Sequence, residues 1–462
     1  MKRVLLLNPP GRRPYIRDNY CSYSAKANYF WEPIDLLVQS AWLRERFDLV
    51  VLDAIAERRT PDDVVRAARD GRFDAVVSLT GSVSLEEDRE LFARIKDATG
   101  AVLAASGDLT LTQPEKTLER MPALDVAIQD YTTHELADFL ADGGEGRTYG
   151  ALAWRDGGRI VPVDPGKPLP REMDYPVPRH DLFPIPRYRI STSVDRRFVT
   201  CIASLGCNFN CPFCICSTMS LRLRAVGSLL AELREVRRMG IREVYFYDPN
   251  FTVNKSRCLA MLQAFADERL GVVFSCNSHI TVPEEVLDAL ARAGCHTIMF
   301  GIETSSEEIL RRYSKGITQE RIRVTLDRCR RRGIRTFGYF LIGLPGETEE
   351  TIRETIRFAR VLPLSYASFN LPSPVEGTEL YREAEAMGAL RSGEQNLDRS
   401  REVSVSLSGI PDARLLALRR MAYRRFYLRP FFLVRTLRLI YPRHKWGFFV
   451  RDVLTFLFRN FL

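Results

Sequence analysis

One stretch of the sequence indicates both the fold and the chemistry: Ser204-Leu205-Gly206-Cys207-Asn208-Phe209-Asn210-Cys211-Pro212-Phe213-Cys214. Its three cysteines have the spacing C-x3-C-x2-C, and Gly206 and Pro212 favour a loop on which the thiolates can converge on one metal centre. A structural zinc site or an electron-transfer cluster normally takes four protein ligands. Three thiolates on a four-iron cluster would instead leave one iron free for another molecule. The alternatives are a zinc site completed by Cys216 or Cys201, and a group of thiols without a metal.

The distribution of the cysteines argues against a disulfide framework. The chain has ten cysteines in 462 residues, and five of them lie between Cys201 and Cys216. At the N-terminus, the apolar run Val4–Leu7 is followed by Asn8-Pro9-Pro10 and is too short for a secretory signal. Because no eighteen apolar residues follow one another without a charge, we expect no membrane-spanning helix and a cytoplasmic protein.

Apolar strands alternate with amphipathic helices on both sides of the cysteine stretch. The cysteines directly follow the first strand of six predicted strand–helix units, which indicate a partial parallel barrel with its active site at the carboxyl ends of the strands. The predicted strands of this barrel are Val199–Ser204, Glu243–Tyr247, Val272–Cys276, Thr297–Gly301, Thr336–Ile342 and Ala367–Leu371. The helices between them are Leu229–Met239, Arg257–Arg269, Glu284–Ala293, Ser306–Arg312 with Gln319–Arg331, and Glu349–Val361.

The N-terminal part of the chain has the same alternation and predicts a doubly wound parallel sheet, which binds ligands beyond the carboxyl ends of its strands. The predicted strands are Lys2–Asn8, Leu49–Asp53, Ala75–Leu79, Val102–Ala105 and Val126–Ile128, and the helices are Pro33–Glu45, Pro61–Arg69, Glu87–Ala98 and Glu135–Ala141.

We divide the chain into four parts. Eight of the 25 prolines lie between Pro162 and Pro186, which indicates an extended linker because proline sustains neither a helix nor a central strand. The parts are a doubly wound, Rossmann-like domain over 1–150, a proline-rich linker over 151–195, a partial (β/α)6 barrel over 196–390 and a helical C-terminal region over 391–462.

The cysteine spacing, in its place after the first barrel strand, closely resembles that of the radical SAM superfamily. The resemblance implies a [4Fe–4S] cluster held by Cys207, Cys211 and Cys214, with S-adenosylmethionine (SAM) on the open iron. One electron from a reductase of the flavodoxin or ferredoxin type would then cleave SAM, and the 5′-deoxyadenosyl radical would abstract hydrogen from the substrate. By the same resemblance, SAM-contacting residues are Phe213, Cys216, Asp248, Asn250, Ser275, Asn277, Glu303, Ser305, Gly343 and Leu344.

Over nearly the whole chain, the order of domains resembles the subgroup of radical SAM enzymes with a cobalamin-binding domain. This subgroup includes hopanoid-modifying enzymes and the anaerobic chlorophyll-ring cyclase, and its methylating members relay a methyl group through cobalamin. The sequence has no Asp-x-His-x-x-Gly segment, and we interpret His134 as a surface residue at the start of a helix. The candidate cobalamin contacts are Thr80, Gly81, Ser82 and Gly107.

The basic charge of the protein belongs to its C-terminal segment. Residues 414–462 contain twelve Lys or Arg and one acid among many aromatic residues, whereas the other 413 residues sum to a charge of −2. Interleaved aromatic and basic side chains are typical of a membrane interface, which we favour, and of single-stranded nucleic-acid binding, which we do not expect. The alternative is a terminal pair of helices that packs its aromatic face on the barrel.

The sequence therefore predicts a radical SAM enzyme that methylates an unactivated carbon of an apolar substrate, such as an isoprenoid lipid, a pigment or a secondary metabolite, with help from cobalamin. Two alternatives stay open. One is a radical cyclisation, oxidation or carbon–carbon coupling with a cobalamin-free N-terminal domain, and the other is a zinc-binding nucleic-acid module.

Overall fold

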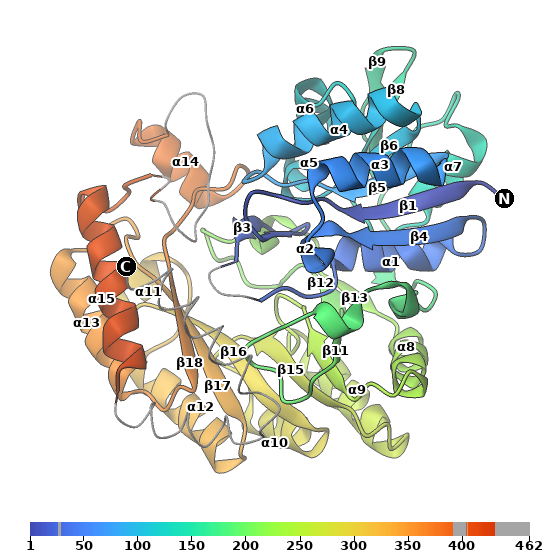
Figure 1. The fold of residues 1–462 in the computed structure, drawn as a ribbon. Helices are drawn as coiled ribbons and strands as arrows, with labels where there is room; N and C mark the ends of the chain where they lie inside the picture. Colours follow the sequence, from blue (N-terminus) through green and yellow to red (C-terminus); the bar gives the residue numbers. More distant parts are fainter. Residues whose placement is uncertain (26–28, 391–402, 404, 430–462) are drawn as a thin grey trace.

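The computed structural model describes residues 1–25, 29–390, 403 and 405–429. Its two large sheets lie next to each other, the first formed by the N-terminal part of the chain and the second by the central part. In Figure 1 the first sheet, in blue to teal, lies above the second sheet, in green to orange. The predicted α/β fold, with a doubly wound domain and a six-stranded partial barrel, is confirmed.

The first sheet has seven strands in the order β4-β1-β5-β6-β7-β8-β9, in which β8 pairs antiparallel with both β7 and β9. Strands β8 and β9 belong to the segment that the sequence assigned to the linker, so the sheet extends beyond residue 150. The strands are β1 (Arg3–Asn8), β4 (Asp48–Asp53), β5 (Ala75–Leu79), β6 (Val102–Ser106), β7 (Val126–Ile128), β8 (Leu152–Asp156) and β9 (Arg159–Val161).

Helices cover both faces of this sheet because its central strands are apolar on both sides. In β1, Val4 and Leu6 pack into one core together with α1 and α7, whereas Leu5 and Leu7 pack into a second core with α3, α4 and α6. The helices of this domain are α1 (Ile34–Leu43), α2 (Ala54–Glu57), α3 (Pro61–Gly71), α4 (Leu85–Thr99), α5 (Asp108–Thr112), α6 (Pro114–Arg120) and α7 (Glu135–Asp142).

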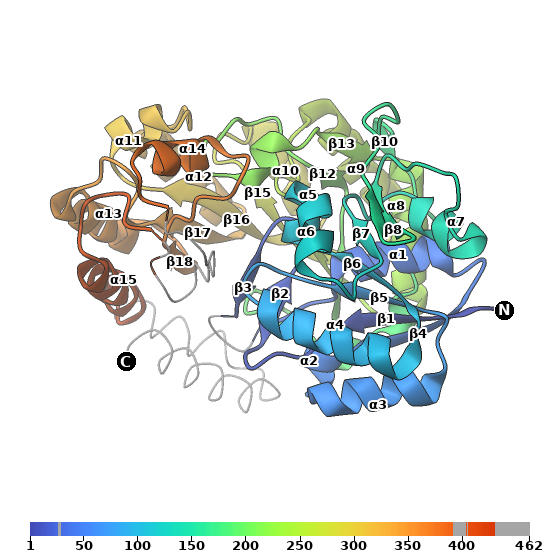
Figure 2. The same ribbon diagram turned by 90° about the horizontal axis from the view of Figure 1, so that it is seen from above.

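The second sheet contains six parallel strands in sequence order, each followed by a helical crossover up to the last strand. Figure 2 shows this sheet curving beside the first domain. Its strands are β11 (Phe198–Cys201), β14 (Glu243–Phe246), β15 (Val273–Ser278), β16 (Cys295–Glu303), β17 (Arg335–Leu341) and β18 (Tyr366–Asn370). The helices are α8 (Val226–Arg238), α9 (Lys255–Asp267), α10 (Glu284–Arg292), α11 (Glu307–Arg312), α12 (Gln319–Arg331), α13 (Glu349–Val361) and α14 (Glu379–Ala386).

Two small sheets connect the domains. A hairpin of β2 (Tyr15–Arg17) and β3 (Ser22–Ser24), which the sequence did not predict, lies between the two large sheets in both ribbon views (Figures 1 and 2). The second small sheet joins the linker to the cysteine region and consists of β10 (Glu172–Met173), β13 (Arg222–Arg224) and β12 (Ser204–Leu205).

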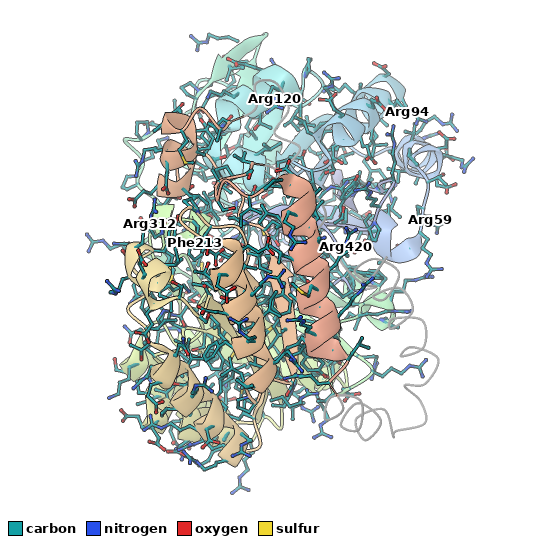
Figure 3. All side chains as sticks on the ribbon, turned by 90° about the vertical axis from the view of Figure 1, so that its left-hand side faces the viewer. Arg59, Arg94, Arg120, Phe213, Arg312 and Arg420 are labelled. Carbon is teal, nitrogen blue, oxygen red and sulfur yellow. The ribbon has the colours of Figure 1, made fainter. Side chains whose placement is uncertain are left out.

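The described part of the C-terminal region is helix α15 (Asp412–Tyr427), which packs against α13 and β18. Figure 3 looks onto this helix, which carries Arg420. The Tyr423 hydroxyl accepts from the amide of Phe369 at 3.1 Å, and the Tyr427 hydroxyl donates to a β18 carbonyl at 2.7 Å. These aromatic side chains pack on the barrel, so they do not support a membrane-facing role; residues 430–462 lie outside the described part. No helix within the described residues is long and apolar enough to cross a membrane.

A buried network of charges joins the two domains. His180 of the linker lies 2.9 Å from Glu32 Oε1 through Nδ1 and 2.9 Å from Glu232 Oε1 through Nε2, so a protonated imidazole can donate to both carboxylates. Glu232 of α8 also pairs with the Arg224 guanidinium, and Glu32 accepts from the backbone amide of Thr200 at 2.6 Å. All four charged side chains are 1% exposed or less. The network ties the segment before α1, the linker and the barrel together.

The charged groups of this network shift one another's pKa values and so stabilise their charged forms. Burial alone would lower the pKa of His180, but the Glu32 charge and the hydrogen bond to Glu232 raise it to about 10. Burial would raise the pKa of Glu232, but the Arg224 charge and His180 lower it to about 2. Two cations therefore balance two anions. His180, Cys201 and Glu232 also lie within 4.8 Å of one another, as metal ligands would, yet their polar atoms are already paired without an ion.

Replacing His180 by Gln should lower the free energy of unfolding by about 3 kcal/mol, because breaking a buried pair leaves charges unpaired. The pKa of His180 is raised in the folded protein from 6.5 to about 10, so its contribution is complete below pH 6.5 and is lost as the pH rises toward 10. The difference in free energy of unfolding between wild type and variant, measured by urea unfolding, should therefore become smaller from pH 6.5 to 10.

The matched control is His134→Gln, because His134 is exposed and its ion pair is with the partly exposed Asp138 at the protein surface. That change should cost less than about 0.5 kcal/mol. An equal loss in both variants, or a gap that widens from pH 6.5 to 10, would contradict the role assigned to the network.

Candidate active site

The cysteine loop leaves the barrel directly after β11 and β12 and turns at Gly206. This residue has φ +74°, and a Cβ on it would lie 2.5 Å from the carbonyl oxygen of Ser220, so no other residue fits there without movement. The amide of Cys214 donates to the carbonyl of Cys211 at 3.0 Å and closes a tight turn. The backbone therefore holds the three cysteines at the carboxyl end of the first barrel strand, as predicted.

The spacing of the three thiols argues against a single zinc ion. Ligand atoms about 2.0–2.3 Å from one zinc lie at most ~4.6 Å apart. Among the described residues, the only set of three ligands within 4.8 Å of one another is His180, Cys201 and Glu232, which excludes the loop cysteines. The thiols are free and at least half-buried. Among the described residues, the loop cysteines therefore form no closed three-ligand site for one ion.

Two further side chains, those of Cys216 and Lys315, shift the pKa of the loop thiols. A hydrogen bond from the Cys216 thiol lowers the pKa of Cys214, and the charge of Lys315 acts in the same direction. Burial raises the pKa of Cys211 to about 11, and Lys315 opposes this shift. Cys216 thus contacts a predicted cluster ligand. Lys315, which the sequence did not single out, is a cation whose charge lowers the pKa of the loop thiols.

Lys315 pairs with Glu303 at the end of the fourth barrel strand. Its Nζ lies 2.9 Å from Glu303 Oε1, and both side chains are about nine-tenths buried. Burial would lower the pKa of Lys315, but the Glu303 charge raises it. A Cβ on Gly301 would lie 2.4 Å from the same carboxylate oxygen, so only glycine leaves room for the pair. Glu303 itself has φ +65°, a strained conformation typical of functional sites.

Phe213, the residue before the third cysteine, lies beside this pair. Its ring centre is 5.8 Å from Lys315 Nζ and 6.1 Å from the ring of Tyr313, which follows α11. Figure 3 shows Phe213 close to Arg312 at the end of α11. The structure therefore brings Phe213, Glu303 and the cysteine loop together, as the sequence predicted.

Asp248, Asn250 and Asn277 lie at the carboxyl ends of β14 and β15, but their side chains bond to the protein's own chain. Asn250 Oδ1 accepts from the Thr252 hydroxyl at 3.1 Å. The Asp248 carboxylate accepts from the Ser204 hydroxyl at 2.6 Å and from the Ala203 amide at 3.1 Å. Asn277 donates to the backbone carbonyl of Asp248 at 2.8 Å. Ser275 is buried two residues earlier in β15, on the same face as Asn277. The carboxylate of Asp248 therefore anchors the start of the cysteine loop.

The last group of predicted SAM contacts surrounds Glu347, which the sequence did not single out. Its Oε2 accepts from the backbone amides of Gly343 at 2.7 Å and Leu344 at 2.9 Å. Burial raises the pKa of Glu347 to about 7. Ser305 is bonded to Thr355 of α13 at 3.0 Å through its amide. Glu347 thus fixes the glycine turn after β17, whereas Ser305 joins the strand end to α13.

The four predicted cobalamin contacts are covered by the β2–β3 hairpin. Asp88 accepts from Gly81 N and the Thr80 hydroxyl at 3.3 Å, and Asp108 accepts from Ser82 N at 3.0 Å. A Cβ on Gly107 would lie 1.9 Å from the Thr80 carbonyl oxygen. The hairpin is anchored on the same two carboxylates, because Arg17 pairs with Asp88 at 2.8 Å and Ser22 N donates to Asp108 at 3.0 Å. These strand-end groups therefore bind the protein's own chain.

A corrin ring would therefore have to bind at another part of the boundary between the two domains. Three buried polar atoms near this boundary lack a hydrogen-bond partner among the described residues. They are the hydroxyls of Tyr20 and Tyr131 and Oδ1 of Asp35. Tyr20 also packs on Tyr247 of the barrel, with ring centres 5.9 Å apart. Unpaired polar groups in a buried place indicate bound water or a ligand, so this boundary fits a polar cofactor. His134 is exposed and is the N-terminal cap residue of α7, as predicted.

Comparisons with known proteins agree with this site. The sequence profile of the radical SAM superfamily matches residues 201–359. An uncharacterized methyltransferase of Pyrococcus horikoshii is 30% identical over 438 residues, which are 92% of this chain and 93% of that protein.

Two solved structures share the fold over most of the chain. The radical SAM methyltransferase TsrM of Kitasatospora setae, with cobalamin and a [4Fe–4S] cluster bound, has a TM-score of 0.66 at 20% identity, covering 85% of this chain and 80% of that one. The cobalamin-dependent radical enzyme OxsB, with aqua-cobalamin and SAM bound, has a TM-score of 0.71 at 15% identity, covering 100% and 72%. The chain therefore belongs to the radical SAM superfamily, and it shares with these two solved structures the fold of an N-terminal sheet domain joined to a radical SAM barrel.

Proposed function

We propose that this protein cleaves SAM reductively at a [4Fe–4S] cluster bound by Cys207, Cys211 and Cys214, and that it methylates a carbon of an apolar substrate. The observation that carries the proposal is the three-thiol loop, held at the strand ends beside the buried pair of Lys315 and Glu303. The named function of the full-length P. horikoshii relative supports methyl transfer. The enzymatic site also disfavours the zinc-binding nucleic-acid module.

The residues of the site divide the work among them. Cys207, Cys211 and Cys214 would hold the cluster, which, once reduced by an external one-electron donor, would supply the electron for cleavage of the C5′–S bond of SAM into methionine and a 5′-deoxyadenosyl radical. Lys315 offers a buried positive charge beside the thiolates, where it would stabilise the anionic cluster and the carboxylate of SAM. Glu303 offers a carboxylate to the SAM amino group, and Phe213 an apolar face to adenine.

The inner face of the barrel supports an apolar substrate. In β17, every second side chain lies on the inner face of the barrel. Phe337, Tyr339 and Leu341 lie there and are half-buried, whereas the residues between them are buried against the helices. Tyr366 of the next strand stacks on Phe337, with ring centres 6.1 Å apart. Tyr245 of β14 points to the same side and contacts Trp31. A face this rich in aromatic rings fits a substrate with extended apolar or aromatic surface.

Cobalamin is proposed as the methyl carrier, bound between the domains against the hairpin. When bound there it supplies a cobalt atom that can hold and transfer a methyl group. The unpaired hydroxyls of Tyr20 and Tyr131 are the groups of this chain that would contact it or its waters. We expect no protein histidine on the cobalt, because His134 is exposed and bonded to Asp138 at 2.7 Å.

One observation favours a second candidate, a radical cyclisation, oxidation or coupling without cobalamin. The hairpin occupies the strand ends of the first domain and fixes them through Asp88 and Asp108. An edge closed in this way leaves no place for cobalamin at these strand ends. The two candidates share the cluster and SAM, but only the first binds cobalamin and transfers a methyl group.

The cysteine assignment predicts the metal content of variants. Protein prepared without oxygen should contain about four irons and four sulfides per chain, and Cys207→Ala, Cys211→Ala or Cys214→Ala should each lose most of them. Cys329→Ala is the matched control, because Cys329 is buried on α12 and takes no part in the site. Stoichiometric zinc in the wild type, or unchanged iron in all three loop variants, would contradict the assignment.

Cobalamin binding is tested by purification in the presence of hydroxocobalamin, followed by the visible spectrum of the washed protein. The first candidate predicts about one cobalamin per chain, and a spectrum that is unchanged in His134→Ala because no histidine lies on the cobalt. A bare cluster spectrum would favour the second candidate. A change in the cobalamin spectrum of His134→Ala would contradict the expectation that His134 does not bind the cobalt.

A further inference from the structure

His279, at the carboxyl end of the third barrel strand, faces the cysteine loop but takes part in none of the interactions above. It directly follows β15, and its ring stacks on Phe209, with ring centres 3.9 Å apart and planes 17° apart. Phe209 lies between the first two cysteines of the loop. The imidazole therefore packs directly against the segment that holds the proposed cluster.

The hydrogen bonds of His279 fix its tautomer. Nδ1 lies 2.7 Å from the Thr281 hydroxyl and accepts from the Thr281 backbone amide at 3.4 Å. Because a backbone amide can only donate, Nδ1 is the acceptor and the proton of the neutral ring lies on Nε2. Burial, together with the charge of Lys315, lowers the pKa of His279 to about 3, so the ring is neutral.

Within the described part of the chain, this Nε2–H group has no acceptor. His279 is 8% exposed, and its Nε2 is a buried atom without a hydrogen-bond partner among the described residues. Leaving a buried donor unpaired is unfavourable, and such groups are rare in folded proteins. The charge of Lys315 acts on His279 as it does on the three loop thiols. The unpaired donor therefore lies in the surroundings of the cofactor site.

We propose that the Nε2–H of His279 donates a hydrogen bond to an anionic acceptor that arrives with the cofactors, either a sulfide of the cluster or the carboxylate of SAM. The inference rests on the proposed function, because both acceptors belong to it. Thr281 is then a positioning residue, since its hydroxyl and amide hold the proton on Nε2. Phe209 holds the plane of the ring.

Two variants separate the hydrogen bond from the packing. His279→Phe keeps an aromatic ring against Phe209 and removes the donor, whereas His279→Gln keeps an N–H donor and removes the ring. Thr281→Val retains the histidine but removes the hydroxyl that helps to keep the ring proton on Nε2. It therefore tests the proposal even if His279→Phe folds poorly. His134→Ala is the matched control, an exposed histidine away from the barrel.

The two acceptors predict different results. If His279 donates to a cluster sulfide, His279→Phe should shift the midpoint potential to more negative values in a redox titration followed by electron paramagnetic resonance without SAM, because the donor stabilises the more negative reduced cluster. If it donates to SAM, the potential without SAM should stay unchanged, and the dissociation constant for SAM should rise about 10-fold. His279→Gln should restore most of either property, and Thr281→Val should change the same property less.

The inference is overturned if His279→Phe and Thr281→Val contain wild-type iron and keep both the potential and the SAM affinity of the wild type. It is also overturned if His279→Gln is as impaired as His279→Phe, because the ring and not the donor would then matter. Failure of the proposed function looks different, since the wild-type protein itself would then hold no four-iron cluster.

Discussion

The arrangement of this protein depends on the burial of four charges between its two domains. Glu32, His180, Glu232 and Arg224 have almost no contact with solvent, so each must find its partner inside the protein. They come from the segment before α1, the linker, α8 and β13, and their pairing is complete only when these parts are assembled. The constraint places the β2–β3 hairpin against the barrel, where Asp18 accepts from the hydroxyl of Tyr247. The carboxyl ends of both sheets thereby meet along one boundary.

Within this frame, much of the candidate site consists of groups that hold the backbone. Asp248 fixes the start of the cysteine loop, and Glu347 fixes the glycine turn after β17. These carboxylates are buried and saturated with hydrogen bonds. The groups left for ligands are fewer: three thiols, the pair of Lys315 and Glu303, Phe213, and the unpaired nitrogen of His279. Such a division is expected where a reactive cofactor must be held in one geometry.

The sequence predicts buried strands and amphipathic helices well because their pattern of apolar residues is local. Ala75–Leu79 and Gln319–Arg331 have the predicted ends, and the cysteine spacing alone identifies the predicted ligand loop. The β2–β3 hairpin is different, since its strands have three residues each and are anchored by Asp88 and Asp108, more than 60 residues away. Lys315 and His279 become candidates only through contacts with distant strands and the cysteine loop. A lysine between turn residues carries no signal of its own in the sequence.

The central claim is that the three-thiol loop supports reductive cleavage of SAM. Reconstituted protein, reduced under anaerobic conditions and mixed with SAM, can be assayed by chromatography for methionine and 5′-deoxyadenosine, with Cys211→Ala as the control. The account predicts both products in equal amounts from the wild type and neither from the variant. Intact SAM, in a wild-type protein that contains about four irons per chain and binds SAM, would contradict it.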